Sequence, residues 1–214
     1  ALTLVILISG RGSNLKAILD AISSGELNAE VCAVISSQAD AAGLDYARQH
    51  QVDTLALDSD DYPSREQYDR ALQGLIDRFN PDLVVLAGFL RILTPELVRH
   101  YQGRMINIHP SLLPALPGLN THQRAIDAGL HEHGASVHFV TEELDGGPVI
   151  VQARVPVLAD DNAEKLANRV LAREHDLYLQ ALRWLVAGRI QCTGGQLLYD
   201  AQPLKQPLLL DSDV

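Results

Sequence analysis

The chain opens with Leu2-Thr3-Leu4-Val5-Ile6-Leu7-Ile8, followed at once by Ser9-Gly10-Arg11-Gly12-Ser13-Asn14. The first part is a nearly continuous aliphatic run, which is typical of a strand buried on both faces of a parallel sheet. The second part is a glycine-containing turn, and residues 14–24 then repeat apolar side chains at helical spacing before Gly25. This strand–turn–helix unit predicts an α/β fold.

Strand and helix patterns go on alternating through the first half of the chain. The expected strands lie at 31–35, 54–57, 83–86 and 105–108, and the expected helices at 41–50, at 64–79 and from Thr94 onward. Ser64 and Gln67 have the spacing of a capping box, and Pro95 suits the first turn of a helix. The alternation predicts a doubly wound, mostly parallel, Rossmann-like sheet.

The second half of the chain has a different pattern. Strands are expected at 136–140 and 149–157, a long amphipathic helix from Asn162 to Ala187, and a hairpin around Thr193-Gly194-Gly195. The segment after about Asp200 is expected to be loosely ordered. We therefore expect one domain over 1–214, in which a Rossmann-like half at 1–100 is followed by a mixed half at 101–214.

Composition limits the functions that the chain can have. Seventeen Lys and Arg residues face 27 Asp and Glu residues, and this net charge of −10 argues against a nucleic-acid partner. The apolar run at Leu2–Ile8 is much shorter than the ~20 residues of a membrane span. The two cysteines, Cys32 and Cys192, are expected to be small buried side chains without a disulfide framework. The composition predicts a soluble cytoplasmic protein.

The turn Ser9–Asn14 is a candidate phosphate site. Glycines let the backbone approach a ligand closely, and the free N–H groups of a helix start suit an anion. A Walker loop is absent, and a dinucleotide fingerprint is incomplete at Leu15 and at Ser36-Ser37. One phosphate on a small ligand fits better. The alternative is an ordinary tight turn, with Ser13 or Asn14 as the helix cap.

Asn107 and His109 are the strongest candidates for catalysis. They lie two residues apart on an expected strand, so that both side chains project to the same side at its carboxyl end. Histidine can move a proton near neutral pH, and the Asn amide can donate a hydrogen bond to an oxyanion. The alternative is a buried polar pair that bonds to the loop backbone.

Asp145, which begins the turn Asp145-Gly146-Gly147-Pro148, is a third candidate. A carboxylate beside His109 would orient the ring and stabilise its protonated form, although Asp is also a routine turn residue. No protein nucleophile is evident, because Ser111 lacks the glycines of a nucleophile elbow. The attacking group should then come from the substrate, which indicates direct transfer through a tetrahedral intermediate.

Four segments carry a resemblance to a known family. They are Gly12-Ser13-Asn14-Leu15, Ala87-Gly88-Phe89-Leu90-Arg91-Ile92-Leu93, Asn107-Ile108-His109-Pro110-Ser111-Leu112-Leu113-Pro114, and Leu144-Asp145-Gly146-Gly147-Pro148. With them, nearly the whole chain resembles the phosphoribosylglycinamide formyltransferases, folate-dependent enzymes of purine synthesis.

The resemblance implies a role for each matching position. Gly12, Ser13 and Asn14 would bind the phosphate of glycinamide ribonucleotide, Glu174 would contact that substrate, and Asn107, His109 and Asp145 would be catalytic. The co-substrate would be 10-formyltetrahydrofolate, with no metal. Its pocket would be lined by Arg65, Leu90, Arg91, Ile92, Leu93, Asn107, Thr141, Glu142, Glu143, Leu144 and Asp145. A monomer or a homodimer is expected, with neither a nucleic acid nor a membrane as partner.

The chain departs from the family pattern at two positions: Leu90 stands where Met is common, and Asn120 where His is common. The first swap conserves volume, and the second puts a supporting role of position 120 in doubt. The closest alternative is a formyltetrahydrofolate hydrolase, disfavoured by Pro110 and by a chain that starts at the catalytic sheet.

Three other functions fit the sequence less well. A methionyl-tRNA formyltransferase would have a basic RNA-binding domain. A non-catalytic sensor of phosphorylated metabolites would use the sheet only for binding. A metal enzyme built on His131-Glu132-His133 lacks a suitable ligand spacing, and we expect these three residues to form an exposed loop.

Overall fold

The computed structural model describes residues 1–210 of the chain. The chain divides into two units, Ala1–Asn107 and Ile108–Val214. The expectation that they form a single domain stays a prediction, and each unit is described by itself.

The first unit is built on parallel strands. These are β1 (Leu2–Ile8), β2 (Ala29–Ser36), β3 (Asp53–Ala56), β4 (Leu83–Leu86) and β5 (Met105–His109), the last of which ends just beyond the unit. They lie in the order β5-β4-β1-β2-β3, and every pair among them is parallel. The central strand β1 is fully buried from Leu4 to Ile8, as its aliphatic run predicts.

The helices of this unit fall into two pairs. Helix α1 (Ser13–Ser23) packs against α2 (Gly43–Gln49), and α3 (Arg65–Asp77) packs against α4 (Pro95–His100). The chain moves from β1 to β3 in one direction, then returns to β4 on the other side of β1. Since crossovers between parallel strands are right-handed, this reversal places the two pairs on opposite faces of the sheet. The expected doubly wound topology is confirmed, with its switch point between β1 and β4.

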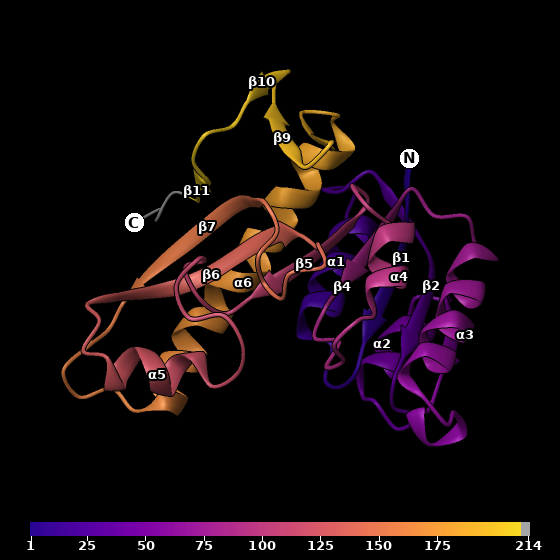
Figure 1. The fold of residues 1–214 in the computed structure, drawn as a ribbon, viewed down its shortest axis with the longest axis horizontal. Helices are drawn as coiled ribbons and strands as arrows, with labels where there is room; N and C mark the ends of the chain where they lie inside the picture. The colour runs from indigo at the N-terminus through magenta and orange to yellow at the C-terminus, as the bar shows by residue number, and fades with distance from the viewer. Residues whose placement is uncertain (211–214) are drawn as a thin grey trace. The chain divides into compact units, whose positions relative to one another are not determined.

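The second unit is built around an antiparallel pair of strands. Strand β6 (Glu132–Phe139) pairs with β7 (Val149–Pro156), and the short β11 (Leu208–Leu209) runs parallel to β7. Helix α6 (Ala163–Val186) passes behind β6 and β7 and packs against both (Figure 1). The expected mixed C-terminal extension and long late helix are therefore confirmed.

A small three-stranded sheet follows α6. Strands β8 (Ile190–Thr193) and β9 (Gln196–Tyr199) form the expected hairpin, and β10 (Gln202–Pro203) adds to β9. The two turn residues, Gly194 and Gly195, have φ of 60° and 78°, which a two-residue hairpin turn of the favoured type requires.

Two expectations for the second unit are wrong. Glu132 and His133 lie in β6 instead of an exposed loop, and the His133 side chain is buried. Buried histidines break the apolar alternation by which a strand is recognised. The chain after Asp200 forms β10 and β11 instead of staying loosely ordered, while its last part, 211–214, lies outside the described residues.

Three smaller details also differ from the sequence pattern. Helix α5 (Thr121–Asp127) was not expected, because only Thr121 and Ala125 are buried and seven residues carry little periodicity. In α6 the apolar spacing predicts that Leu185 faces inward, but this side chain is half-exposed, whereas the ring of Tyr178 is fully buried. The N-cap of α1 is Gly12 instead of Ser13 or Asn14.

The helix starts that sequence predicted are formed by side-chain caps. Ser64 Oγ accepts a hydrogen bond from the N–H of Gln67 at 3.1 Å, and Asn162 Oδ1 accepts one from the N–H of Lys165 at 2.8 Å. Each cap satisfies one of the backbone donors that a helix start leaves free.

The cap of α6 can be tested by the substitution Asn162→Ala. Losing this acceptor should lower the free energy of unfolding by about 1 kcal/mol, as measured by urea denaturation. Asn162→Ser keeps an acceptor oxygen and should retain most of that stability. Equal stabilities for the Ala and Ser variants would contradict a capping role.

Candidate active site

The carboxyl end of β5 carries the two residues that the sequence singled out first. Asn107 is half-buried, and His109, two residues on, is only 6% exposed. Alternation along a strand places both side chains on the same side of β5. The strand therefore ends in an amide donor and an imidazole that project together.

Both ring nitrogens of His109 face oxygen atoms. Nε2 lies 2.9 Å from the carbonyl oxygen of Leu116, and Nδ1 lies 3.5 Å from Oδ2 of Asp145. A carbonyl oxygen can only accept a hydrogen bond, so Nε2 carries a proton and donates it. A second proton, taken up at Nδ1, would face a carboxylate and form an ion pair with it.

Asp145 is held in place by its turn. Its side chain is 9% exposed, and Oδ2 accepts a hydrogen bond from the N–H of Gly118 at 2.9 Å. Its φ of 52° lies in the left-handed region, which Asp tolerates better than most residues. A Cβ at Gly147 would collide with the carbonyl of Phe139, so the turn needs glycine there. The turn thus presents the carboxylate to His109 in one orientation.

His138 is a member of this cluster that sequence reasoning missed. Its Nδ1 donates to the carbonyl of Phe139 at 3.0 Å, and its Nε2 lies 3.9 Å from Oδ1 of Asp145 with no hydrogen-bond partner among the described residues. Burial is the largest cause that lowers the pKa of His138. A neutral imidazole therefore lies on the other side of the Asp145 carboxylate. The available signal was its place near the end of β6, one strand period after Ser136.

Two further histidines, His122 and His133, contact each other in the same unit. Nδ1 of His122, on α5, lies 3.0 Å from Nε2 of His133, on β6, and the two rings meet edge to face. Burial, followed by the charge of His122, lowers the pKa of His133 to about 4. One ring must donate and the other accept, so the pair is stable only when at least one of them is neutral.

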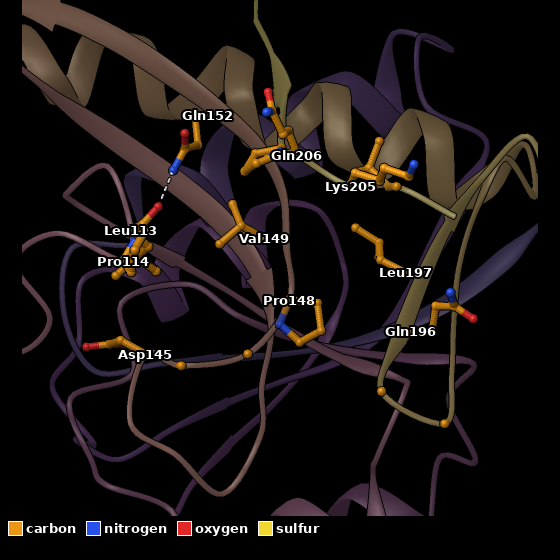
Figure 2. Close-up of a pocket in the computed structure, with 16 residues that line it drawn as sticks. Leu113, Pro114, Asp145, Pro148, Val149, Gln152, Gln196, Leu197, Lys205 and Gln206 are labelled. Carbon is orange, nitrogen blue, oxygen red and sulfur yellow. Dashed lines mark hydrogen bonds between the residues drawn. The ribbon is translucent and has the colours of Figure 1, made fainter. Parts of the chain in front are cut away.

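The loop that carries Leu116 is fixed from below by buried polar groups. Ser136 Oγ donates to the carbonyl of Ser111 at 2.7 Å and accepts from the N–H of Leu113 at 3.0 Å. The amide of Gln152, on β7, donates to the carbonyl of Leu113 at 2.7 Å (Figure 2). These bonds fix the backbone from Ser111 to Leu113. Leu116, a little further along the same loop, supplies the carbonyl oxygen that faces Nε2 of His109.

A cavity of about 780 Å³ adjoins the Asp145 turn (Figure 2). One wall is formed by Leu113, Gln152 and the residues from Asp145 to Val149. The opposite wall is formed by the Gly194-Gly195 turn and by the segment from Leu204 to Pro207, which includes Lys205. This second wall could not be predicted from the sequence, because hairpin turns and proline-containing segments have no periodicity that would place them beside the Asp145 turn.

The candidate phosphate loop belongs to the first unit. Gly12 has a φ of 70°, and a Cβ there would lie 2.9 Å from Cα of Gly43, so this glycine serves a close backbone contact. Gly10 has open space around it, and Arg11 is exposed. Asn14 is 8% exposed, and its Oδ1 has no partner among the described residues. Ser13 and Asn14 form the first turn of the 11-residue helix α1.

The remaining candidate residues are divided between the two units. In the first unit, the side chains of Leu90 and Ile92 are 80% and 56% exposed, and Arg65 is exposed at the first residue of α3. Arg91 stacks on the ring of Tyr68, 3.8 Å from its centroid, and Leu93 is half-buried.

In the second unit, most of the predicted folate-binding loop is exposed. Glu142, Glu143 and Leu144 are exposed, Thr141 is half-exposed, and Glu174 is half-buried on α6. The structure thus brings His109 and Asp145 together within one unit, as the sequence predicted.

Among residues 1–210, no three His, Cys, Asp or Glu side chains gather closely enough to hold a metal ion. None of the helices in this part of the chain has the length and apolarity needed to cross a membrane.

Comparison with known proteins places the chain in a family. Residues 2–182 match the formyl transferase family. A phosphoribosylglycinamide formyltransferase of Escherichia coli is 51% identical over 203 residues, which cover 95% of this chain and 96% of that protein. The human trifunctional purine biosynthetic protein adenosine-3 is 40% identical over 186 residues, 87% of this chain but 18% of that protein.

Solved structures agree with the sequence comparison. A phosphoribosylglycinamide formyltransferase of Coxiella burnetii, solved in complex with CHES, superposes with a TM-score of 0.93 at 49% identity. The match covers 98% of this chain and 99% of that one. The chain therefore belongs to the formyl transferase family.

The lowered pKa of His133 predicts how stability depends on pH. The pKa falls from 6.5 to about 4 on folding, so the unfolded chain binds a proton more readily between these values. Stability should therefore be fully present above pH 6.5 and be lost as the pH falls toward 4, by on the order of 2 kcal/mol. Urea denaturation across this pH range measures the loss.

His133→Gln removes the titrating group and should flatten this dependence. His131→Gln is the matched control, since His131 lies two residues away and is exposed. A dependence that is equally steep in both variants would show that His133 is not its origin.

Proposed function

We propose that this chain transfers the formyl group of 10-formyltetrahydrofolate to the amine of 5'-phosphoribosylglycinamide, a step of de novo purine biosynthesis. The observation that carries the proposal is the pair formed by His109 and Asp145. Nδ1 lies 3.5 Å from Oδ2, the two side chains are 8% and 9% exposed, and the nearby hydroxyl of Ser111 donates to the carbonyl of Ala115 at 2.6 Å. Such a pair suits proton transfer in a reaction whose nucleophile comes from the substrate.

The reaction is a direct transfer. The amine attacks the formyl carbon, a C–N bond forms, and the formyl oxygen becomes negatively charged in a tetrahedral intermediate. The amide of Asn107 and the imidazole of His109 stabilise this oxyanion. The bond from the formyl carbon to the folate nitrogen then breaks, and the proton lost by the attacking amine passes to that nitrogen with the help of His109.

Asp145 sets the state of His109 in this scheme. Its carboxylate faces Nδ1, so that it orients the ring and leaves Nε2 as the edge that works on the substrate. In the free protein the carbonyl of Leu116 occupies that edge at 2.9 Å. Substrate binding must therefore take the place of this carbonyl before His109 can act.

The substrates are assigned to the residues that the family resemblance indicates. Gly12, Ser13 and Asn14 bind the phosphate, supported by the free N–H groups at the start of α1. Glu174 contacts the ribonucleotide. The formyl-folate pocket is lined by Arg65, Leu90, Arg91, Ile92, Leu93, Asn107, Thr141, Glu142, Glu143, Leu144 and Asp145.

The proposal extends to the setting of the enzyme. It works in the cytoplasm, as a monomer or a homodimer, on small molecules alone, and its chemistry needs no metal. The net charge of −10 supports the absence of a nucleic-acid partner.

One assay separates transfer from its alternatives. The protein is mixed with 10-formyltetrahydrofolate, with and without glycinamide ribonucleotide, and release of tetrahydrofolate is followed. The proposal predicts release only when the amine is present. Release without the amine would indicate a hydrolase, and binding of both compounds without any turnover would indicate a sensor.

The pair itself is tested by Asp145→Asn, which keeps an acceptor for the N–H of Gly118 but removes the charge beside His109. Turnover should fall by about 10²- to 10⁴-fold, while the melting temperature changes little. Asp160→Asn, at an exposed loop aspartate, is the charge-matched control. Turnover of Asp145→Asn close to that of the control would overturn the role given to Asp145.

A further inference from the structure

The segment from Leu90 to Leu93 combines an exposed apolar face with a firmly held backbone. It leaves β4 through Gly88, which has a φ of 77°, at the switch point of the sheet, where doubly wound folds bind ligands. The side chains of Leu90 and Ile92 are 80% and 56% exposed. Exposed apolar side chains indicate a binding site when the backbone that carries them is held in one conformation.

Buried polar groups hold both ends of this segment. At its start, the N–H of Leu90 donates to Oγ of Ser9 at 2.9 Å, and Ser9 is itself 2.6 Å from Oγ of Ser37. At its end, the N–H of Thr94 donates to Oδ2 of Asp69 at 2.7 Å. Ser9 is 9% exposed and Asp69 is 2% exposed, so both hydrogen bonds are shielded from water.

Asp69 does more than pack α3 against α4. A buried carboxylate is costly to keep, and its other oxygen, Oδ1, has no hydrogen-bond partner among residues 1–210. The link between the two helices is also made by the ion pair of Arg70 and Glu96, at 3.8 Å, which is exposed. The bond from Asp69 goes instead to the residue that directly follows the apolar segment.

The sequence at the start of α4 explains why another helix must supply this acceptor. Thr94 is the N-cap, and its own N–H would be accepted by a Glu or Gln at the third helical position in a capping box. That position is occupied by Leu97, which has no acceptor. Asp69 takes this role from α3, so the end of the segment is fixed by a neighbouring helix.

Tyr68, the residue before Asp69, supports the middle of the segment. Its hydroxyl donates to the carbonyl of Leu57 at 2.7 Å, and the guanidinium of Arg91 lies over its ring at 3.8 Å. Two consecutive residues of α3 therefore hold the segment from beneath, one through a ring face and one through a backbone hydrogen bond.

We propose that Asp69 is a positioning residue for the formyl donor: by fixing the N–H of Thr94, it presets the Leu90–Leu93 segment to bind the ring system of 10-formyltetrahydrofolate. This inference rests on the proposed function, in which that segment lines the folate pocket. Fixing the segment before binding removes the entropy cost of ordering it afterwards, and so strengthens binding of the donor alone.

The test compares two substitutions that both keep a side chain branched at Cγ. Asp69→Leu removes the acceptor, and Asp69→Asn keeps an acceptor oxygen for the N–H of Thr94. Asp69→Leu should raise the KM for 10-formyltetrahydrofolate by about 10- to 100-fold, the effect of misplacing a binding segment, and leave the KM for glycinamide ribonucleotide unchanged. Asp69→Asn should restore the wild-type KM, and Arg70→Ala, which breaks only the exposed ion pair between the helices, should leave both KM values unchanged.

A merely structural role for Asp69 gives a different pattern. It would change the melting temperature, or both KM values together, and either result without a selective rise in the donor KM overturns the proposal. Wild-type protein that lacks transfer activity overturns the proposed function instead, and calorimetric binding of 10-formyltetrahydrofolate to the same variants then tests Asp69 separately. Absence of that binding in wild type overturns both.

A measurement on the unmodified protein guards against misfolding of Asp69→Leu. In hydrogen exchange followed by NMR, the amides of Leu90 and Thr94 should be protected before any ligand is added, and 10-formyltetrahydrofolate should add little further protection. Fast exchange of these two amides in the free protein, slowed only by the donor, would show that the segment is ordered by the ligand and not by Asp69.

Discussion

The site depends on one contact, between Nδ1 of His109 and the carboxylate of Asp145. Neither residue could hold this geometry alone. His109 is fixed by its strand and by the carbonyl of Leu116, while Asp145 is fixed by the N–H of Gly118 and by a turn that requires Gly147. The loop that follows His109 thus restrains both partners. The buried imidazole and carboxylate therefore face each other at 3.5 Å before any substrate binds.

The same construction recurs in each of the two units: a buried polar side chain holds a backbone group, and that backbone presents the working residue. Gln152 and Ser136 hold Leu113 below the loop that reaches His109. In the first unit, Ser9 and Asp69 hold the two ends of the Leu90–Leu93 segment. Such groups are costly to bury, and each of them makes a hydrogen bond to a specific backbone partner. Geometry at the surface is therefore set by hydrogen bonds one layer beneath it.

Much of this could be predicted from residue order, for physical reasons. An aliphatic run such as Leu4–Ile8 is typical of a strand buried on both faces of a parallel sheet. Two polar residues that lie two positions apart at the end of a strand must project to the same side of it. His138, His133 and Gln152 could not be found in this way. Their importance comes from partners on other strands, and a buried histidine lowers the apolar periodicity that marks its own strand. Asp69 was hidden for the same reason, because its partner, Thr94, lies 25 residues away.

The central claim, that His109 is held with a protonated Nε2 on the carbonyl of Leu116 and with Nδ1 toward the carboxylate of Asp145, can be tested by nitrogen-15 NMR of the imidazole. The free protein should show a proton on Nε2 of His109, because the carbonyl oxygen of Leu116 can only accept a hydrogen bond. A neutral ring that carries its proton on Nδ1, with Nε2 unprotonated, would contradict the account.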